Sequence, residues 1–387
     1  MASYHQMGHH SENLMREPRL QGFAGVVLSP VNFDEEQTAS QIESCRRRLG
    51  LDTVFDPQLY YPRSERGRLA SWHYFPRNAG SLDIQSVSWW RGLTNKLMET
   101  CARLRPDAVC SPAFVPRAFT DEYFSNSVKL CNDLAGDLSN SETRLIQTLL
   151  VNLSDLAESG KAMRIASIMS RTKAESIYLV IVSNREPRRE FCDEEELKGA
   201  MKLISALENS GLPVLVGFSS SDMALWKLAG ATSCATGKFF NLRRFTSSRF
   251  AEPSDGGTPM AYWFEEALMA YLRESDVIRV RTQGAFSEAS TRNPFAKEIL
   301  KCIDDAQGQP WIALAWRQWM YAFSDLEKRI DRGTVDVSQL LRSADNAWSA
   351  LDNANVLMEE RQNNGAWVRA WRRAINEYET ESRSPRT

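Results

Sequence analysis

The chain has 387 residues, 43% of them apolar, and a net charge of −2, which is enough for one large domain and a smaller one. Because acidic and basic residues are nearly balanced, no overall field attracts nucleic acid or a membrane, and any such attraction must be local. No apolar run reaches the roughly 18 residues of a membrane-spanning helix, and the N-terminus lacks the apolar core of a secretory signal. We therefore expect a cytoplasmic protein that does not enter a membrane.

Cysteine and histidine usage narrows the chemistry further. The seven cysteines are widely spaced and form no CxxC pair, which is typical of buried thiols in a reducing compartment. Three of the four histidines (His5, His9 and His10) lie near the N-terminus, so His73 is expected to be the only histidine of the folded body. A histidine-based zinc site or a Ser–His–Asp triad is therefore not expected, and nothing in the sequence indicates a metal or a cofactor.

Residues 1–22 are expected to form a flexible N-terminal arm. From residue 23 onward, short apolar runs alternate with helical patterns. Apolar runs of this length are typical of parallel strands that are buried on both faces. The runs cover residues 24–32, 52–60, 108–114, 145–152, 176–184, 213–220 and 233–241, and residues 276–280 are the candidate for an eighth strand.

This repeat predicts an α/β fold, a (β/α)8-like barrel over residues 23–284. An open, doubly wound sheet is the alternative, although no GxGxxG motif follows the first run. Helix signals lie between the runs: Asp193 followed by Glu196 has the spacing of a capping box. Beyond residue 285 the pattern is helical throughout, which predicts an α-helical C-terminal domain over residues 285–387.

Two aromatic segments are candidate interfaces. Residues 60–81 form an insertion after the second run that is rich in aromatics and arginine, including Tyr60, Arg63 and Trp72. Such a mixture suits single-stranded nucleic acid or a protein partner, and the alternative is a lid packed on the barrel mouth. In the helical domain, Trp367 and Trp371 belong to an apolar stripe at helical spacing. That stripe is either a docking face for a partner or a second copy, or helix–helix core.

The most informative segment is residues 223–250, which contain five Lys or Arg and no Asp or Glu. In barrels the ligand-binding groups lie on the loops that follow the strands, and the last two of these loops commonly bind phosphate. The segment therefore predicts an anion site for a nucleic acid or a phosphorylated small molecule. The alternative is that its arginines pair with acidic neighbours such as Asp255 or cover the helical domain. The expected contacts are Lys238, Asn241, Arg243 and Arg244, with Asn184 and Arg185 beside them.

Asp56 is the candidate catalytic residue. It ends an apolar run and precedes Pro57, which holds it in an extended conformation. A carboxylate at that position is suited to act as an acid, a base or a nucleophile. The alternative is an aspartate that only caps a turn.

The unit 212–245 resembles the last strands of the tRNA-guanine transglycosylase barrel. The matching pieces are a glycine-bearing strand, a Ser-rich helix start with an acid, an alanine–glycine helix end, and a strand that runs into basic residues, at 214–217, 219–222, 229–231 and 233–244. The family's nucleophilic aspartate would fall near Cys234 or Ala235, and its zinc cluster is absent. The resemblance implies a divergent or non-catalytic relative with an anion- or nucleic-acid-binding mouth.

Together these features predict a barrel that binds a nucleic acid or a phosphate-bearing ligand, in the manner of a divergent nucleotide- or base-modifying enzyme. The alternative is a non-catalytic barrel that serves as a scaffold subunit of a larger assembly.

Overall fold

Eight parallel strands form a closed barrel in the computed structural model, which describes residues 3–139, 141–251, 260–305 and 310–383. Each strand pairs with the next one in the sequence, and β1 pairs with β8. This arrangement confirms the predicted barrel and excludes the open sheet. The strands are β1 (Ser3–Gln6), β2 (Phe23–Leu28), β3 (Asp52–Phe55), β4 (Ala108–Cys110), β5 (Arg144–Asn152), β6 (Ser176–Val182), β7 (Val214–Val216) and β8 (Ser233–Thr236).

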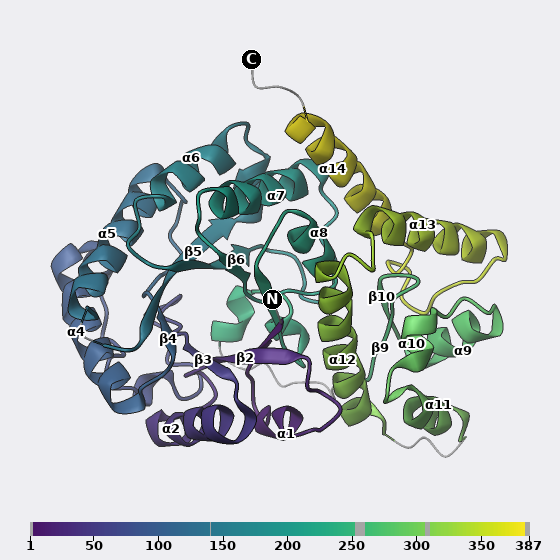
Figure 1. Cartoon of the computed structure of the whole chain (residues 1–387), viewed down its shortest axis with the longest axis horizontal. Coiled ribbons are helices and arrows are strands. Elements are labelled where there is room, and N and C mark those ends of the chain that lie inside the picture. The colour runs from purple at the N-terminus through teal and green to yellow at the C-terminus, as the bar shows by residue number, and fades with distance from the viewer. Residues whose placement is uncertain (1–2, 140, 252–259, 306–309, 384–387) are drawn as a thin grey trace.

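Helices follow most strands and surround the barrel (Figure 1). The Asp193 side chain accepts a hydrogen bond from the Glu196 backbone N–H at the start of α7, as the sequence predicts. The helices of this part are α1 (Glu12–Met15), α2 (Glu35–Glu43), α3 (Ser81–Gln85), α4 (Val87–Leu104), α5 (Asp121–Asp137), α6 (Lys161–Met169), α7 (Glu194–Asn209) and α8 (Met223–Leu228).

The eighth strand differs from the prediction. It is β1, inside the segment expected to be a flexible arm, whereas residues 276–280 lie in helix α9 (Glu274–Thr282). β1 has only four residues and carries polar side chains, so no apolar run marks it. Distant partners hold it instead: Tyr4 donates a hydrogen bond to Asp52, and Ser3 donates one to Glu327.

His5 corrects a second expectation, because it belongs to the barrel wall and is fully buried. Burial lowers the pKa of its imidazole to about 3. Within the described residues, neither ring nitrogen has a hydrogen-bond partner. His73 is therefore not the only histidine of the folded body.

The C-terminal region is helical, as predicted, with one added hairpin (Figure 1). The hairpin pairs β9 (Trp263–Glu265) with β10 (Ala270–Leu272) in antiparallel fashion. No helix in the described ranges is long and apolar enough to span a membrane. The remaining helices are α10 (Glu288–Arg292), α11 (Ala296–Asp304), α12 (Ile312–Asp331), α13 (Val337–Asn353) and α14 (Ala366–Arg383).

Helix α12 joins the helical region to the barrel. Its buried Glu327 accepts hydrogen bonds from the Ser3 hydroxyl and the Cys234 backbone N–H. Lys227 of α8 lies 3.6 Å from the same carboxylate and 2.8 Å from Asp331. One apolar core cluster contains residues from both regions, so a domain boundary at residue 284 stays a prediction.

Gly217 makes room for the ring of Tyr178 in the barrel interior. A Cβ atom added to Gly217 would lie 2.5 Å from the Tyr178 hydroxyl oxygen and 2.6 Å from its ring. Tyr178 is fully buried and donates a hydrogen bond of 2.9 Å to Gln6 across the interior. The ring therefore has little freedom to move away from Gly217.

Gly217→Ala is expected to lower the free energy of unfolding by about 1–3 kcal/mol, because the added methyl group overpacks this interior. Urea unfolding measures the change. Gly92→Ala in α4 is the control: its Cβ would meet no atom within 4 Å, so about 0.5–1 kcal/mol of stabilisation is expected from the better helix former. Equal effects at both positions would contradict the close packing around Tyr178.

Candidate functional site

Asp56 lies directly after β3, at the C-terminal mouth of the barrel, and only 1% of its surface is exposed. One carboxylate oxygen accepts a hydrogen bond of 3.0 Å from the Gln58 backbone N–H, and the other accepts one of 2.8 Å from the Tyr60 hydroxyl. Burial raises the pKa of Asp56 to about 6, against the opposing effect of these hydrogen bonds and of the Arg249 charge. Asp56 therefore changes its protonation state close to neutral pH.

Arg249 is a cation whose charge lowers the pKa of this carboxylate. It belongs to a 3₁₀ turn, Ser247–Phe250, and is 7% exposed. Its Nη2 atom donates a hydrogen bond of 2.9 Å to the Ser29 hydroxyl, which lies just after β2. Burial lowers the pKa of the guanidinium to about 10, although the negative charge of Asp56 opposes this change. The positive charge is thus poorly compensated within the protein.

Some buried donor groups of this region have no acceptor. In the described part of the chain, Arg249 Nε and Gln6 Nε2 are buried without a hydrogen-bond partner. Gln58 has a positive φ of 49°, a conformation that costs a non-glycine residue energy and recurs at functional sites. Because unpaired buried donors are costly, the mouth favours a ligand rich in acceptor atoms.

The predicted pair Arg243 and Arg244 is buried behind the mouth. Arg244 lies 2.7 Å from Glu190 and 3.2 Å from Asp222, over the ring of Phe191. Arg243 donates hydrogen bonds to the carbonyl oxygens of Gly237 and Lys238. Both guanidinium groups therefore have protein partners, an arrangement that matches the pairing alternative. Their contact with an anion stays a prediction.

The other expected anion contacts are dispersed. The buried Lys238 ammonium donates a hydrogen bond of 3.3 Å to the His10 carbonyl oxygen and lies over the rings of Phe239 and Trp316. Burial lowers its pKa. Asn184 is exposed after β6, while Arg185 is half-buried and donates to the Cys192 sulfur. Asn241 has a buried side-chain oxygen that no described residue contacts by a hydrogen bond.

Most of the expected interface residues are buried in the protein, and one is exposed. Tyr60 and Trp72 are buried and pack inside the insertion and the barrel, whereas Arg63 is exposed. Trp367 and Trp371 are buried too, with indole N–H groups that donate to the carbonyl oxygens of Met269 and Phe191. Their positions match the core alternative, and an interface through them stays a prediction.

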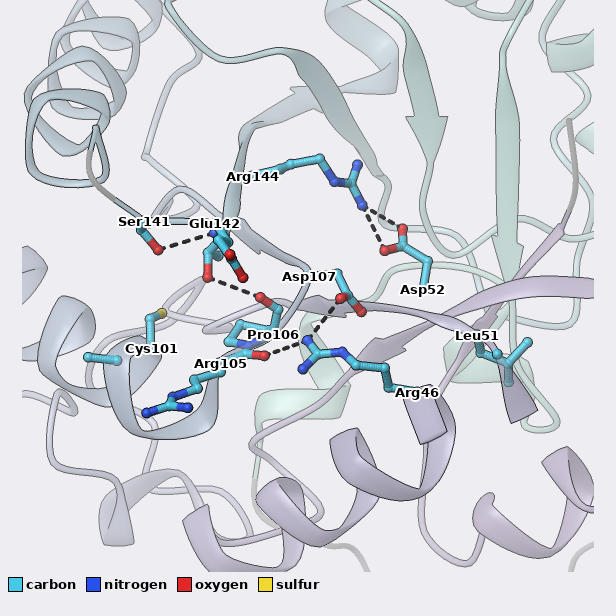
Figure 2. A pocket seen from close by; sticks show the side chains of 13 residues that line it. Arg46, Leu51, Asp52, Cys101, Arg105, Pro106, Asp107, Ser141, Glu142 and Arg144 are labelled. Carbon is cyan, nitrogen blue, oxygen red and sulfur yellow. Dashed lines mark hydrogen bonds and ion pairs between the residues drawn. The ribbon is translucent and has the colours of Figure 1, made fainter. Parts of the chain in front are cut away.

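A cavity of about 930 Å³ lies at the opposite, N-terminal end of the barrel. Arg46 lies 2.8 Å from Asp107, and Arg144 lies 2.7 Å from Asp52. Figure 2 shows both pairs among the residues that line the cavity. Asp52 begins β3, Arg144 begins β5, and Asp107 directly precedes β4. The Arg144–Asp52 pair therefore links the starts of β5 and β3, and the Arg46–Asp107 pair ties the helical turn Ser44–Arg48 to the start of β4. At this end of a barrel such contacts indicate a structural role.

Comparisons with known proteins add little to this description. No family model and no curated protein matches the chain. Among solved structures, deoxyribose phosphate aldolase from Aeropyrum pernix is 16% identical with a TM-score of 0.33, over 61% of this chain and 84% of that one. A family 2 AP endonuclease from Brucella melitensis is 11% identical with a TM-score of 0.37, over 64% and 96%. Dihydrodipicolinate synthase from Bacillus clausii is 11% identical with a TM-score of 0.33, over 99% and 96%.

All three TM-scores lie below 0.5, so the barrel assignment comes from the strand pairing of this chain. None of the three structures is a tRNA-guanine transglycosylase, and that finer resemblance stays a prediction. The fold and the site thus define a TIM-type barrel with a buried acid and a buried guanidinium at its C-terminal mouth.

Proposed function

We propose that the protein binds a phosphate-bearing ligand at the C-terminal mouth of the barrel, with Arg249 contacting the anion and Asp56 exchanging a proton. One observation carries this proposal: the buried Arg249 guanidinium is held by Ser29 after β2, and the buried Asp56 carboxyl group is held by Tyr60 and Gln58 after the neighbouring strand β3. The phosphate belongs either to a small molecule or to a nucleic acid.

An oxyanion that binds here would stabilise the buried groups in two ways. It would add negative charge near the buried Arg249, whose pKa is lowered by burial in spite of the charge of Asp56, and it would accept a hydrogen bond from Arg249 Nε. Asn184 and Arg185, on the loop after β6, lie at the same end of the barrel and extend the proposed site at its rim. In this proposal Arg243 and Arg244 stabilise the chain near the mouth through their pairs with protein groups.

Asp56 is the residue that would transfer a proton in the proposed site. A carboxyl group that is poised between its two protonation states near neutral pH is suited to general acid–base catalysis. Tyr60 and the Gln58 backbone hold it in one orientation. A nucleotide- or base-modifying reaction is the class that this arrangement and the phosphate contact favour together.

Arg249→Gln is expected to weaken the binding of inorganic phosphate and of a nucleoside monophosphate at least about tenfold, or about 1.4 kcal/mol. The reason is that glutamine has no charge, although it still reaches toward Ser29. Isothermal titration calorimetry measures the affinities. The control is Arg77→Gln, which removes an exposed arginine from the 60–81 insertion and is expected to leave both affinities unchanged.

The same titration is repeated with a single-stranded RNA oligonucleotide as the ligand. If the ligand is nucleic acid, the oligonucleotide binds more tightly than the monophosphate, and its affinity falls steeply with salt concentration. Wild-type protein that binds none of the three probes, or Arg249→Gln protein that binds all of them normally, would contradict the proposed function.

The scaffold role remains the second candidate, because two apolar side chains near the insertion are exposed. Leu82 of α3 is 82% exposed, and Val87, which begins α4, is 45% exposed. Exposed apolar clusters often mark protein interfaces. Native mass spectrometry of the protein from its own host separates the two candidates, since a co-purified polypeptide without a small ligand supports the scaffold.

A further inference from the structure

One segment of the chain covers the proposed site. We call residues 245–250 the mouth segment. The rings of Phe245 and Phe250 lie edge-on to Tyr60, with centroids 5.2 and 5.8 Å away. Phe245 also packs against Phe218, two residues after the end of β7, with ring centroids 5.3 Å apart. These contacts place the mouth segment against Tyr60, whose hydroxyl donates the hydrogen bond to Asp56.

Side chains provide most of the attachment of this segment. Its 3₁₀ turn has short-range backbone hydrogen bonds, from Arg249 N–H to the Thr246 carbonyl and from Ala251 N–H to the Ser248 carbonyl. The links to the rest of the chain include Arg249 to Ser29 after β2, the Ser64 hydroxyl of the 60–81 insertion to the Phe250 carbonyl, and one bridge between Phe245 and Val182 of β6. A segment that is held in this way opens locally at a lower cost than a barrel strand does.

The chain just before the mouth segment is firmly anchored. Arg244 is paired with Glu190 and Asp222, and Arg243 with the carbonyl oxygens of Gly237 and Lys238. Buried charges with several partners do not leave easily. Movement would therefore begin after Arg244 and carry Arg249 with it.

We propose that the mouth segment is a movable cover, which leaves the mouth to admit the ligand and closes over it through Arg249. Opening returns the guanidinium to water, and an anion beneath the cover compensates its charge in the closed state. Ligand binding and closure therefore favour each other. The ligand-dependent part of this proposal rests on the proposed function, whereas the opening itself does not.

The chain contains its own reporter for this opening. Cys110 ends β4 and is fully buried, and the charge of Asp56 acts on its thiol. Because Phe55 pairs with Val109, the next residues, Asp56 and Cys110, lie side by side at the mouth. Cys131 on α5 is equally buried but lies outside the barrel, so its modification reports global unfolding instead.

The experiment measures the rates at which a thiol reagent modifies Cys110 and Cys131, by mass spectrometry of the peptides. In Phe250→Ala protein we expect Cys110 to react at least about tenfold faster, with Cys131 unchanged, because the lost ring contacts loosen the cover. Ser64→Ala removes the hydrogen bond to the Phe250 carbonyl, together with the oxygen that accepts from the Arg66 N–H, and should accelerate Cys110 about threefold or more. The control is Ser71→Ala, which removes a similar bond, to the Arg68 carbonyl, elsewhere in the insertion.

Each outcome decides the proposal. Unchanged Cys110 rates in both variants, or equal acceleration of Cys110 and Cys131, would overturn the movable cover. Inorganic phosphate is expected to slow the modification of Cys110 in the wild-type protein. If phosphate binds but does not slow it, the coupling to the ligand is wrong. If phosphate does not bind and the variants still accelerate Cys110, the proposed function fails and the cover stands.

Discussion

Arg244→Met is expected to lower the free energy of unfolding by about 3–5 kcal/mol at pH 7.5, as measured by urea unfolding. Arg244 is 1% exposed and pairs with both Glu190 and Asp222. Its removal leaves two carboxylates buried together without a cation. A methionine fills similar space, so the loss reports the missing charge and not a cavity.

The loss should depend on pH in a defined direction. Burial raises the pKa of Glu190 to about 7 and raises that of Asp222 as well. The folded state therefore holds these protons more tightly than the unfolded state does, and stability falls as the pH rises through this range. Without Arg244 both pKa values rise further, so the variant should lose less stability at pH 5.5 than at pH 8.

A surface pair provides the matched control. Arg292 and Glu288 are one helical turn apart and mostly exposed, so Arg292→Met should cost no more than about 0.5 kcal/mol. Adding Glu190→Gln to the Arg244→Met protein should recover part of the loss. If Arg244→Met is as stable as wild type but loses phosphate binding, the arginine contacts the ligand directly and its structural assignment is wrong.

The sequence predicts most of the barrel because local pattern and tertiary environment agree there. β5 and β6 are long, buried on both faces and rich in Leu, Ile and Val, and they pair over seven residues from Ile146 and Ser176 to Asn152 and Val182. β1 has no such pattern. Its Ser3, Tyr4 and Gln6 side chains form hydrogen bonds with Glu327, Asp52 and Tyr178, which lie far away in the chain. No local signal reveals these partners.

The candidate site, too, could be predicted from the sequence only in part. Asp56 is recognisable because a carboxylate after a buried strand must lie at the barrel mouth. The basic segment is recognisable by composition, but composition does not tell which of its cations faces the mouth. That choice depends on Glu190 and Asp222, which pair with Arg244 and leave Arg249 for the mouth. Ser29 and Gln58 carry no signal in the sequence beyond their positions after β2 and β3.

Asp56→Asn is expected to tighten sulfate binding about tenfold at pH 7.5, or about 1.4 kcal/mol. In the wild-type protein the ionised Asp56 competes with an incoming anion for Arg249. Because the pKa of Asp56 is about 6, wild-type affinity should rise as the pH falls through that value and the carboxylate gains a proton. Sulfate keeps its charge over this range, so the dependence belongs to the protein, and the variant should lose it.

The same substitution should also change how stability depends on pH when no ligand is bound. Because burial raises the pKa of Asp56 to about 6, the folded state disfavours the ionised carboxylate, so the stability of the wild type should fall as the pH rises through that value, and the uncharged asparagine should remove this dependence. Sulfate should recover more stability in the variant than in the wild type. Asp155→Asn, at the same end of the barrel after β5, should show neither effect. A variant that binds sulfate more weakly, or keeps a pH midpoint near 6, would show that Asp56 does not compete with the anion for Arg249.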